Sequence, residues 1–353
     1  MKRFFECLVP VTACNLRCDY CYVIQENRNS NKILPFKYKP EELRAALSKS
    51  RLGGECFFSF CGAGETLFHP ELPKLVSELL SEGHYINITT NGSFTKGVEN
   101  VIRHIDTNFA KHLLFSFSLH YVELLKRNLL EVFKNNVEFV RKAGCSILIQ
   151  FNLYDGYLPY LEEIKKFCLD NFGALPQVAA TRKEEGKISL YTDMDKCEYV
   201  SYGRDFCSPL FEITIENFNH PCHDYCYAGK WSYVMNLERG VIKPCYCNGK
   251  EYDIFENIEC DLPISVVGKH CGNVYCINSS HFLSLGVVPS RYKDVTYASL
   301  RNREEAEWFS EEIKTFLNRK LEDDNKEDGV IKMWWNEMNY LTMRAKRKIS
   351  KYI

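Results

Sequence analysis

Three cysteines lie close together near the start of the chain, in the stretch CNLRCDYCY. Cys14, Cys18 and Cys21 have the spacing CxxxCxxC, and the aromatic Tyr20 directly precedes the third cysteine. Three thiolates on one tight loop can bind three corners of a cubane iron–sulfur cluster, for which cysteine is the usual ligand. Since the loop offers only three, one iron keeps the open position typical of catalytic metal sites and can bind a further ligand through nitrogen and oxygen.

Alternating strand and helix patterns place this cysteine loop at the end of a strand. Short apolar runs predict strands at 4–10, 55–60, 85–90, 113–119, 146–152 and 176–181, and amphipathic segments predict helices from Pro40, from Pro70 to about Leu80, and over 122–143 before Gly144. This repeat indicates parallel strands with crossover helices. Six units fall short of the eight that close a full barrel, so we expect an α/β fold, a partial (β/α)6 barrel, with ligands at the C-terminal ends of its strands.

Glycines and polar residues follow the next strands at the same end. The loop CGAGET after the second strand, the stretch TTNG ending the third strand, and two serines on the fourth supply Gly62, Ala63, Gly64, Glu65, Asn91, Ser116 and Ser118. Because the C-terminal ends of parallel barrel strands form one face, we expect these residues beside the cysteine loop.

The cysteine loop resembles the signature loop of the radical S-adenosylmethionine (SAM) superfamily, CxxxCx(aromatic)C, and CGAGET resembles that family's Gly-Gly-Glu-Pro motif. The resemblance covers about residues 4 to 182. It implies a [4Fe–4S] cluster on Cys14, Cys18 and Cys21, whose open iron is chelated by the amino and carboxylate groups of SAM. One electron then cleaves SAM to a 5′-deoxyadenosyl radical.

The same resemblance assigns the remaining residues to SAM. Tyr20 is expected near the adenine, the loop Gly62, Ala63, Gly64 and Glu65 is expected to receive the SAM amino group, and Asn91, Ser116 and Ser118 are expected to supply polar contacts. Thr66 stands where the family usually has proline. This departure leaves the backbone acceptors of the loop and the Glu65 carboxylate available.

The composition changes after about residue 182. Nine of the seventeen cysteines fall between residues 183 and 290, where we expect short strands at most: Cys197, Cys207, Cys222, Cys226, Cys245, Cys247, Cys260, Cys271 and Cys276. Metal can hold such a region together where its apolar core is thin. Helical patterning returns after Ser290, so we expect three parts: a barrel over 1–182, a cysteine-rich domain over 183–290 and helices over 291–353.

Two apolar stripes characterise the C-terminal helices. The first contains Phe309, Ile313, Phe316 and Leu321, and the second contains Ile331, Trp334, Met338, Leu341 and Ala345. The acidic segment 322–329 is expected to separate them as a solvated turn.

The segment from Cys226 to Cys245 resembles the opening of the SPASM and twitch extensions of the same superfamily, C-x(9–15)-G-x4-C with Gly240 as the glycine. In these extensions a β-hairpin carries two cysteines to an auxiliary iron–sulfur cluster, and NLERG is a plausible hairpin turn. The resemblance implies the ligands Cys226, Cys245, Cys271 and Cys276, with Cys222, Cys247 and Cys260 as rivals. Since the full SPASM continuation CxxCx5Cx3C is missing, we expect one auxiliary [4Fe–4S] cluster rather than two. The alternative is structural zinc, with Cys271, Cys276 and His281 as ligands.

The bulk composition narrows the classes of protein. Lys and Arg number 45 against 46 Asp and Glu, so the net charge gives no support for a general nucleic-acid binder. The odd number of cysteines and the 26% of charged residues argue against a secreted disulfide scaffold.

The N-terminus resembles a lipoprotein signal, but Glu6 and Pro10 interrupt its apolar run. No segment approaches the roughly 20 apolar residues that span a bilayer. We therefore expect a cytoplasmic protein with neither nucleic acid nor membrane as partner.

The remaining cysteines, three residues after the fourth and fifth strands, and a basic stretch near the C-terminus give weaker signals. Cys7, Cys56, Cys61, Cys145 and Cys168 lie on strand or helix patterns and are expected to be small buried hydrophobic residues. His120, Tyr154 and Asp155 follow the fourth and fifth strands and are candidates for substrate contact. The basic stretch RAKRK (344–348) is expected to be a solvated helix end rather than a contact for membrane or nucleic acid.

The expected function is radical chemistry on an unactivated C–H bond. SPASM and twitch members suggest a peptide or protein substrate that becomes cross-linked, epimerised or oxidised, with a flavodoxin or ferredoxin as reductant. The alternatives are the same chemistry on a small molecule such as a sugar, aminocyclitol or nucleotide, and a non-redox, zinc-stabilised binding protein. The sequence identifies no catalytic residue beyond the ligands of the cofactors.

Overall fold

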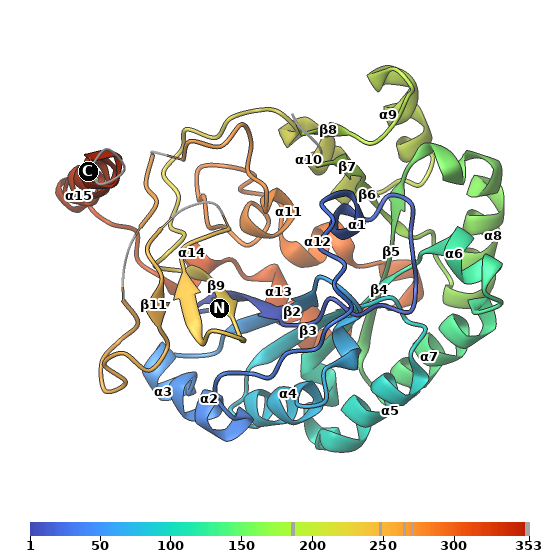
Figure 1. Ribbon diagram of the computed structural model, residues 1–353, viewed down its shortest axis with the longest axis horizontal. Helices are drawn as coiled ribbons and strands as arrows, with labels where there is room; N and C mark the ends of the chain where they lie inside the picture. The colour runs from blue at the N-terminus through green and yellow to red at the C-terminus, as the bar shows by residue number, and fades with distance from the viewer. Residues whose placement is uncertain (185–187, 247–248, 264–265, 270, 350–353) are drawn as a thin grey trace.

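A nine-stranded sheet with the order β11-β10-β9-β1-β2-β3-β4-β5-β6 forms the centre of the molecule (Figure 1). The structure, a computed structural model, describes the whole chain except residues 185–187, 247–248, 264–265, 270 and 350–353. Six consecutive strands pair in parallel: β1 Phe4–Val9, β2 Phe57–Gly62, β3 Tyr85–Thr90, β4 Leu113–Ser118, β5 Ser146–Leu153 and β6 Gln177–Ala180. They confirm the predicted partial (β/α)6 barrel.

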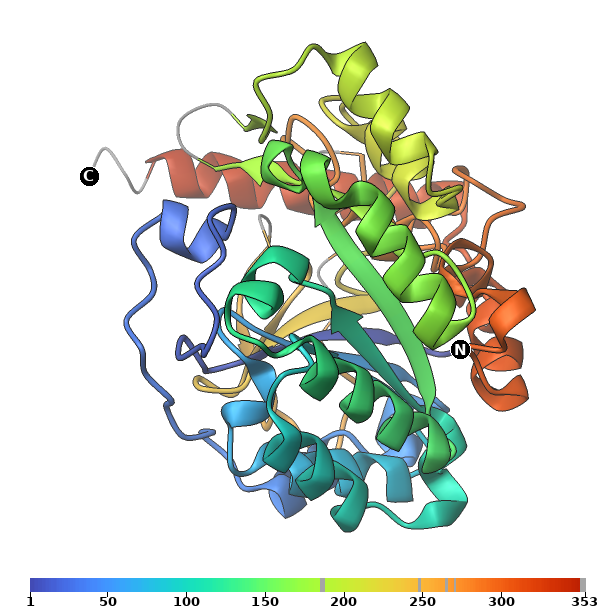
Figure 2. The ribbon, with the colours of Figure 1, turned by 90° about the vertical axis from the view of Figure 1, so that its right-hand side faces the viewer.

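Helices cover the outside of these strands. They are α2 Pro40–Ala46, α3 Lys49–Leu52, α4 Leu72–Ser81, α5 Thr95–His104, α6 Tyr121–Lys126, α7 Leu130–Lys142 and α8 Leu161–Phe172. Figure 2 shows α7 and α8 alongside β5 on the outer surface of the sheet. These helices bury the outer face of the sheet, and the strands are almost continuously buried, from β1 to β5.

One predicted helix is wrong in its extent. The segment 122–143 forms two helices, because α6 ends at Lys126 and α7 begins at Leu130. Asn128 between them has a φ of 55°, a left-handed conformation that asparagine tolerates better than most residues. The periodicity continues across the break, so it does not reveal the turn.

A hairpin extends the sheet beyond β1. It consists of β9 Ser232–Asn236 and β10 Val241–Lys243, followed by β11 Tyr252–Asp253, and the predicted turn ends at Gly240 with a φ of 63°. Strand β9 pairs in parallel with β1, while β10 pairs antiparallel with β9. The hairpin is confirmed, but its addition to the barrel sheet was not predicted.

Helices also occupy the region where we expected short strands at most. After the small sheet of β7 Arg182–Lys183 and β8 Ser189–Leu190 come α9 Lys196–Arg204 and α10 Pro209–Asn217. Asp195 accepts hydrogen bonds from the first N–H groups of α9, and Ser208 caps α10 in the same way. These caps explain why helices form in a segment with weak apolar periodicity.

The remaining helices are α1 Tyr22–Gln25, α11 Ser279–Phe282, α12 Tyr297–Arg301, α13 Glu311–Asn318, α14 Leu321–Asp324 and α15 Val330–Ile349, and short 3-10 turns cover 66–68, 107–112, 155–160 and 304–306. The first C-terminal stripe is buried against the barrel, where Phe316 stacks on Tyr85 with ring centroids 3.7 Å apart. The acidic segment begins inside α14, so it is not purely a turn. In the described part of the chain, no helix is long and apolar enough to cross a membrane.

Candidate active site

Backbone hydrogen bonds join the glycine loop after β2 to the segment that leads into the cysteine loop. Gly64 N donates to Val11 O at 2.8 Å, and Glu65 N donates to Ala13 O at 2.8 Å. A Cβ atom at Gly64 would lie 2.1 Å from Ala13 O, a backbone atom that cannot move aside easily. Glycine is therefore required at position 64 for the two loops to meet, directly before Cys14.

Glu65 fixes this loop to the neighbouring strand. Its carboxylate is 2% exposed and accepts hydrogen bonds from Leu67 N at 3.1 Å, Thr90 Oγ1 at 2.6 Å and Asn91 N at 2.8 Å. Burial raises the pKa of Glu65, and these donors oppose that rise. Glu65 therefore supports the glycine loop through these three hydrogen bonds, and the residue also lines the cavity described below.

Thr66 closes the same turn. Its hydroxyl oxygen accepts a hydrogen bond from Gly62 N at 3.0 Å, and the residue is 2% exposed. Proline has no hydroxyl group, so it could not satisfy this N–H in the same way. The departure from the family motif therefore has a structural role.

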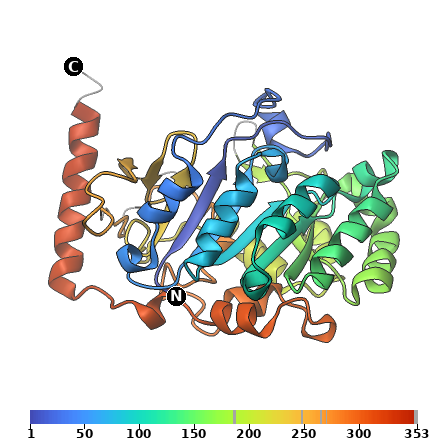
Figure 3. The ribbon, with the colours of Figure 1, turned by 90° about the horizontal axis from the view of Figure 1, so that it is seen from below.

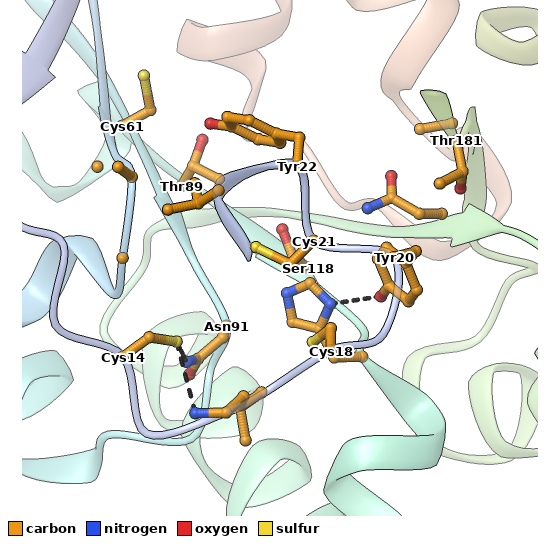
Figure 4. A pocket seen from close by; sticks show the side chains of 18 of the residues that line it. Cys14, Cys18, Tyr20, Cys21, Tyr22, Cys61, Thr89, Asn91, Ser118 and Thr181 are labelled. Atoms are coloured by element: carbon orange, nitrogen blue, oxygen red, sulfur yellow. Dashed lines mark hydrogen bonds between the residues drawn. The ribbon is translucent and has the colours of Figure 1, made fainter. Parts of the chain in front are cut away.

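The three cysteines of the first loop face a common space (Figure 4). Cys14 is exposed, Cys18 is buried and Cys21 is intermediate. Burial raises the pKa of the Cys18 thiol, and the nearby charges of Cys21 and Cys14 raise it further. Three thiolates at this spacing therefore need compensating positive charge, which an iron–sulfur cluster would supply. The donor set fits such a group.

A polar network surrounds the first cysteine. The side chains of Asn91 and Cys14 point toward each other (Figure 4), and Asn91 Nδ2 donates to Cys14 Sγ at 3.7 Å. The same Nδ2 also donates to Asn15 Oδ1 at 2.9 Å. Asn15 Nδ2 in turn donates to Ser93 Oγ at 2.7 Å, and Ser93 Oγ donates to Asn91 Oδ1 at the same distance. Sequence reasoning identified Asn91 but missed Asn15 and Ser93. Their only sequence signal is their position next to the cysteine loop and the TTNG stretch.

Tyr20 is held from several sides. Its hydroxyl forms hydrogen bonds with His120 Nδ1 at 2.6 Å and with Tyr157 Oη at 3.0 Å, and its ring centroid lies 4.6 Å from that of Tyr154. Burial lowers the pKa of His120 to about 4, so its imidazole is neutral near pH 7. Its Nδ1 can then accept a hydrogen bond from the Tyr20 hydroxyl. His120 and Tyr154, our candidates for substrate contact, hold Tyr20 in place, although His120 also lines the cavity. Asp155 accepts hydrogen bonds from Thr192 and the backbone of residue 193.

A cavity of about 780 Å³ lies over these groups. The predicted residues that line it are Cys14, Cys18, Tyr20, Cys21, Gly62, Ala63, Gly64, Glu65, Asn91 and Ser118. Ser116 is not among the described lining residues, because its hydroxyl donates to Asn87 Oδ1 at 2.6 Å inside the barrel. Thr181 also lines the cavity. Its hydroxyl oxygen is buried and has no hydrogen-bond partner in the described part of the chain. The size and this unsatisfied hydroxyl fit a cofactor such as SAM.

Cys61 is a correction to the sequence analysis. We expected a small buried hydrophobic residue, but Cys61 is partly exposed and lines the cavity. Its thiol donates to Glu6 Oε1 at 3.3 Å, and Asn278 Nδ2 lies 3.4 Å from Glu6 Oε2. The other four cysteines of that group, Cys7, Cys56, Cys145 and Cys168, are buried as predicted.

A second group of cysteines gathers in the cysteine-rich region. The thiols of Cys245, Cys271 and Cys276 lie near enough to Cys226 for their charges to raise its pKa, although burial is the larger cause. This brings together the four predicted auxiliary ligands. The rival Cys222 is also close, because its charge raises the pKa of Cys276, again after burial.

The other candidates of this region lie elsewhere. The carbonyl of Cys260 accepts a hydrogen bond from Arg51, and Cys260 lines a separate cavity. His281 is stacked on Phe4, with ring centroids 5.7 Å apart. Cys247 lies outside the described residues. Within the described residues, no three His, Cys, Asp or Glu side chains are arranged to hold a single metal ion. A cubane distributes its cysteines over different irons, so it accepts a wider arrangement.

Comparisons with known proteins agree with this geometry. Residues 8–168 match the model of the Radical SAM superfamily. The N-terminal part of this chain is a radical SAM domain. A domain of this superfamily implies a [4Fe–4S] cluster and SAM. No curated protein sequence matches the chain.

Solved structures similar to the chain include three proteins with bound SAM. SuiB of Streptococcus suis has a TM-score of 0.51 and 16% identity, over 73% of this chain and 65% of SuiB. The enzyme anSMEcpe has a TM-score of 0.46 and 18% identity, over 72% and 78% of the two chains. BtrN in complex with 2-DOIA has a TM-score of 0.35 and 13% identity, over 92% and 90%. The chain thus spans just under two thirds of SuiB, and the likeness to SuiB supports the fold of the radical SAM domain.

Proposed function

We propose that the chain is a radical SAM enzyme that abstracts a hydrogen atom from a peptide or protein substrate held in the cavity. When bound, the cluster and SAM supply a 5′-deoxyadenosyl radical. The observation that supports this function best is the extent of the cavity. It reaches from Cys14, Cys18 and Cys21 to Tyr275 and Ile277, the two neighbours of Cys276. A substrate in the cavity would lie beside both cysteine groups.

The residues of the chain contribute positioning and enclosure. Asn91 directs an N–H group at Cys14 Sγ, and such hydrogen bonds to sulfur tune the reduction potential of iron–sulfur clusters. Glu65 and Gly64 hold the glycine loop under the cavity. Tyr20 is fixed by neutral His120, which leaves one wall of the cavity rigid and uncharged. These are requirements for a site that must protect a reactive radical from water.

An auxiliary [4Fe–4S] cluster on Cys226, Cys245, Cys271 and Cys276 is part of this proposal. Four cysteines would close the cluster to other ligands, which suits electron transfer from a substrate radical rather than substrate binding. Cys222 remains the rival ligand within the described residues. The reductant of the first cluster would be a small redox protein such as a flavodoxin or ferredoxin, in a cytoplasmic setting.

The peptide class is supported by likeness of fold to SuiB, which has been solved with its precursor peptide SuiA. A small molecule is the second candidate. The polar side chains at the cavity wall, including Gln150 and Asn152 at the end of β5, suit a hydroxylated small substrate as well as a peptide backbone.

Reductive cleavage of SAM tests the proposed function. The reconstituted, oxygen-free protein is mixed with SAM and dithionite, and 5′-deoxyadenosine is quantified by chromatography. Wild type is expected to form it, and the variant Cys14→Ala/Cys18→Ala/Cys21→Ala is expected to form none. Cys260→Ala is the matched control, since this thiol lies in a separate cavity, and should behave as wild type. If the purified protein contained zinc instead of iron and formed no 5′-deoxyadenosine, it would be a zinc-stabilised binding protein and the proposed function would be wrong.

Iron and sulfide analysis tests the auxiliary cluster separately. Two cubanes predict about eight irons in wild type and about four in the triple variant, at four per cluster. Loss of a further four on adding Cys226→Ala and Cys276→Ala would support the assigned ligands. If wild type contained about four irons and the triple variant contained none, the radical cluster would be supported and the auxiliary cluster would be refuted.

A further inference from the structure

The outer face of the C-terminal helix α15 is apolar and open to solvent. Ile331 is 84% exposed, Trp334 and Trp335 are each 60% exposed, and Met338 and Leu341 are each 43% exposed. These residues include the second apolar stripe of the sequence, which such periodicity would normally place against a core. The structure instead turns it away from the body, at the edge of the molecule in Figure 3.

Contacts on the opposite face fix this orientation. Asn336 Nδ2 donates to Tyr225 Oη at 3.0 Å, and Lys269 N donates to Glu337 Oε1 at 3.3 Å. Tyr340 is 7% exposed. The inner face of α15 is thus bound to segments that adjoin Cys226 and Cys271. Rotating the helix to bury its apolar stripe would break these contacts.

The stripe has the spacing of a coiled-coil seam. Ile331, Trp334, Met338, Leu341 and Ala345 follow one another at intervals of three, four, three and four residues, and all five are exposed. Apolar residues at alternating intervals of three and four form the a and d positions of a heptad, which pack into a matching helix. A helix of 20 residues, about 30 Å long, presents nearly three heptads.

The exposed area is large for a free surface. A large aromatic side chain offers roughly 150–250 Å², so the two tryptophans alone expose on the order of 200–300 Å². With Ile331, Met338, Leu341 and the 83% exposed Val330, the face exceeds the few hundred Å² typical of the largest patch on a monomer. It comes near the roughly 800 Å² per partner of a stable protein interface.

We propose that the outer face of α15 binds the same face of a second copy of this chain, forming a two-fold helix pair. A seam of a and d residues is self-complementary under a two-fold axis, so an identical helix is a suitable partner. Among the described side chains of the helix, Lys332 is the cation beside the seam, and it pairs with Asp328. The described positions of the seam, from Ile331 to Leu341, are all apolar, as an identical apolar seam requires of its partner.

Oligomeric state tests this proposal without a substrate. The full chain, reconstituted without oxygen, is measured by light scattering after size exclusion at about 5 to 100 μM. Wild type should reach twice its 41.2 kDa mass, while Trp334→Glu and, independently, Ile331→Glu should remain at 41.2 kDa. Leu169→Glu is the matched control, because this isolated residue of α8 is 50% exposed, and it should dimerise like wild type.

Tryptophan fluorescence gives a second measurement on the same samples. Trp231 and Trp308 are each 1% exposed, so quenching by acrylamide reports Trp334 and Trp335. Dilution from the dimer should increase quenching several-fold. A dimer that survives Trp334→Glu would place the interface elsewhere and refute the proposal. A wild-type monomer would also refute the proposal. If its tryptophans were nevertheless protected from acrylamide, the face would be covered by another part of the same chain. If the monomer instead sedimented with phosphatidylserine vesicles, the face would bind a membrane surface.

Discussion

Replacing Glu6 by glutamine should make the protein more stable at high pH. Glu6 lies on β1 at 4% exposure, with Cys61 and Asn278 as donors to its carboxylate. Burial raises its pKa from 4.5 to about 7, and the two hydrogen bonds and the charge of Arg301 only partly oppose this. A carboxyl group with these properties is costly to keep charged beside the cavity.

The size and sign of the effect follow from proton linkage. Between pH 4.5 and about 7 the folded protein binds more protons at Glu6 than the unfolded chain, so the free energy of unfolding falls as pH rises through this window. The full difference corresponds to about 3 kcal/mol. Glutamine avoids this cost but can accept only one of the two hydrogen bonds, a loss of about 1 kcal/mol. The variant should therefore gain about 2 kcal/mol above pH 8 and lose about 1 kcal/mol near pH 4.

Urea unfolding of the cluster-free chain, followed by circular dichroism at pH 4.5, 6 and 8.5, measures this difference. Glu162→Gln is the control, because this side chain is 86% exposed and should leave the pH profile unchanged. If the difference between wild type and Glu6→Gln were the same at all three pH values, or if the variant were less stable at pH 8.5, the assignment of a raised pKa to Glu6 would be wrong.

Three further predictions concern the site. Gly64→Ala should weaken SAM binding by at least tenfold in equilibrium dialysis, because the added Cβ would lie 2.1 Å from Ala13 O. Gly62→Ala is the control: its Cβ would meet only ordinary contacts at 3.5 Å, so this variant should bind SAM with an affinity within a few-fold of wild type. Thr66→Pro, which restores the usual family residue, should lower the free energy of unfolding by about 1–3 kcal/mol in denaturant titration, because Gly62 N loses its acceptor; unchanged stability would contradict the role given to the hydroxyl. The imidazole of His120, whose pKa burial lowers to about 4, should show no titration by NMR between pH 5.5 and 8, and a midpoint near 6.5 would show that it is not buried as described.

The sequence predicted the elements that repeat and the loops that carry distinctive residues. The six parallel strands follow from apolar runs separated by amphipathic helices. Gly64 was identified from the resemblance of its loop to a family motif, and the structure explains the glycine by the close approach to Ala13. Residues next to a recognisable motif, such as Asn91, could also be placed. Local spacing was sufficient in each case.

Features that depend on long-range packing could not be predicted. The pairing of β9 with β1 joins residues more than 200 positions apart, and neither strand has a pattern that identifies the other as its partner. The hydrogen bond from Tyr20 to His120 spans 100 positions and determines the role of both side chains. The exposure of Trp334 reverses the usual meaning of an apolar stripe, because polar residues on the other face of α15 bind the body.

Electron paramagnetic resonance of the reduced protein tests the central claim, that Cys14, Cys18 and Cys21 hold a cluster whose open iron binds SAM. The wild-type protein should give a [4Fe–4S]⁺ signal that changes when SAM is added. The variant lacking the three thiols should retain only the signal of the auxiliary cluster, unchanged by SAM. A wild-type spectrum that does not respond to SAM, or an equal response in the variant, would contradict the account.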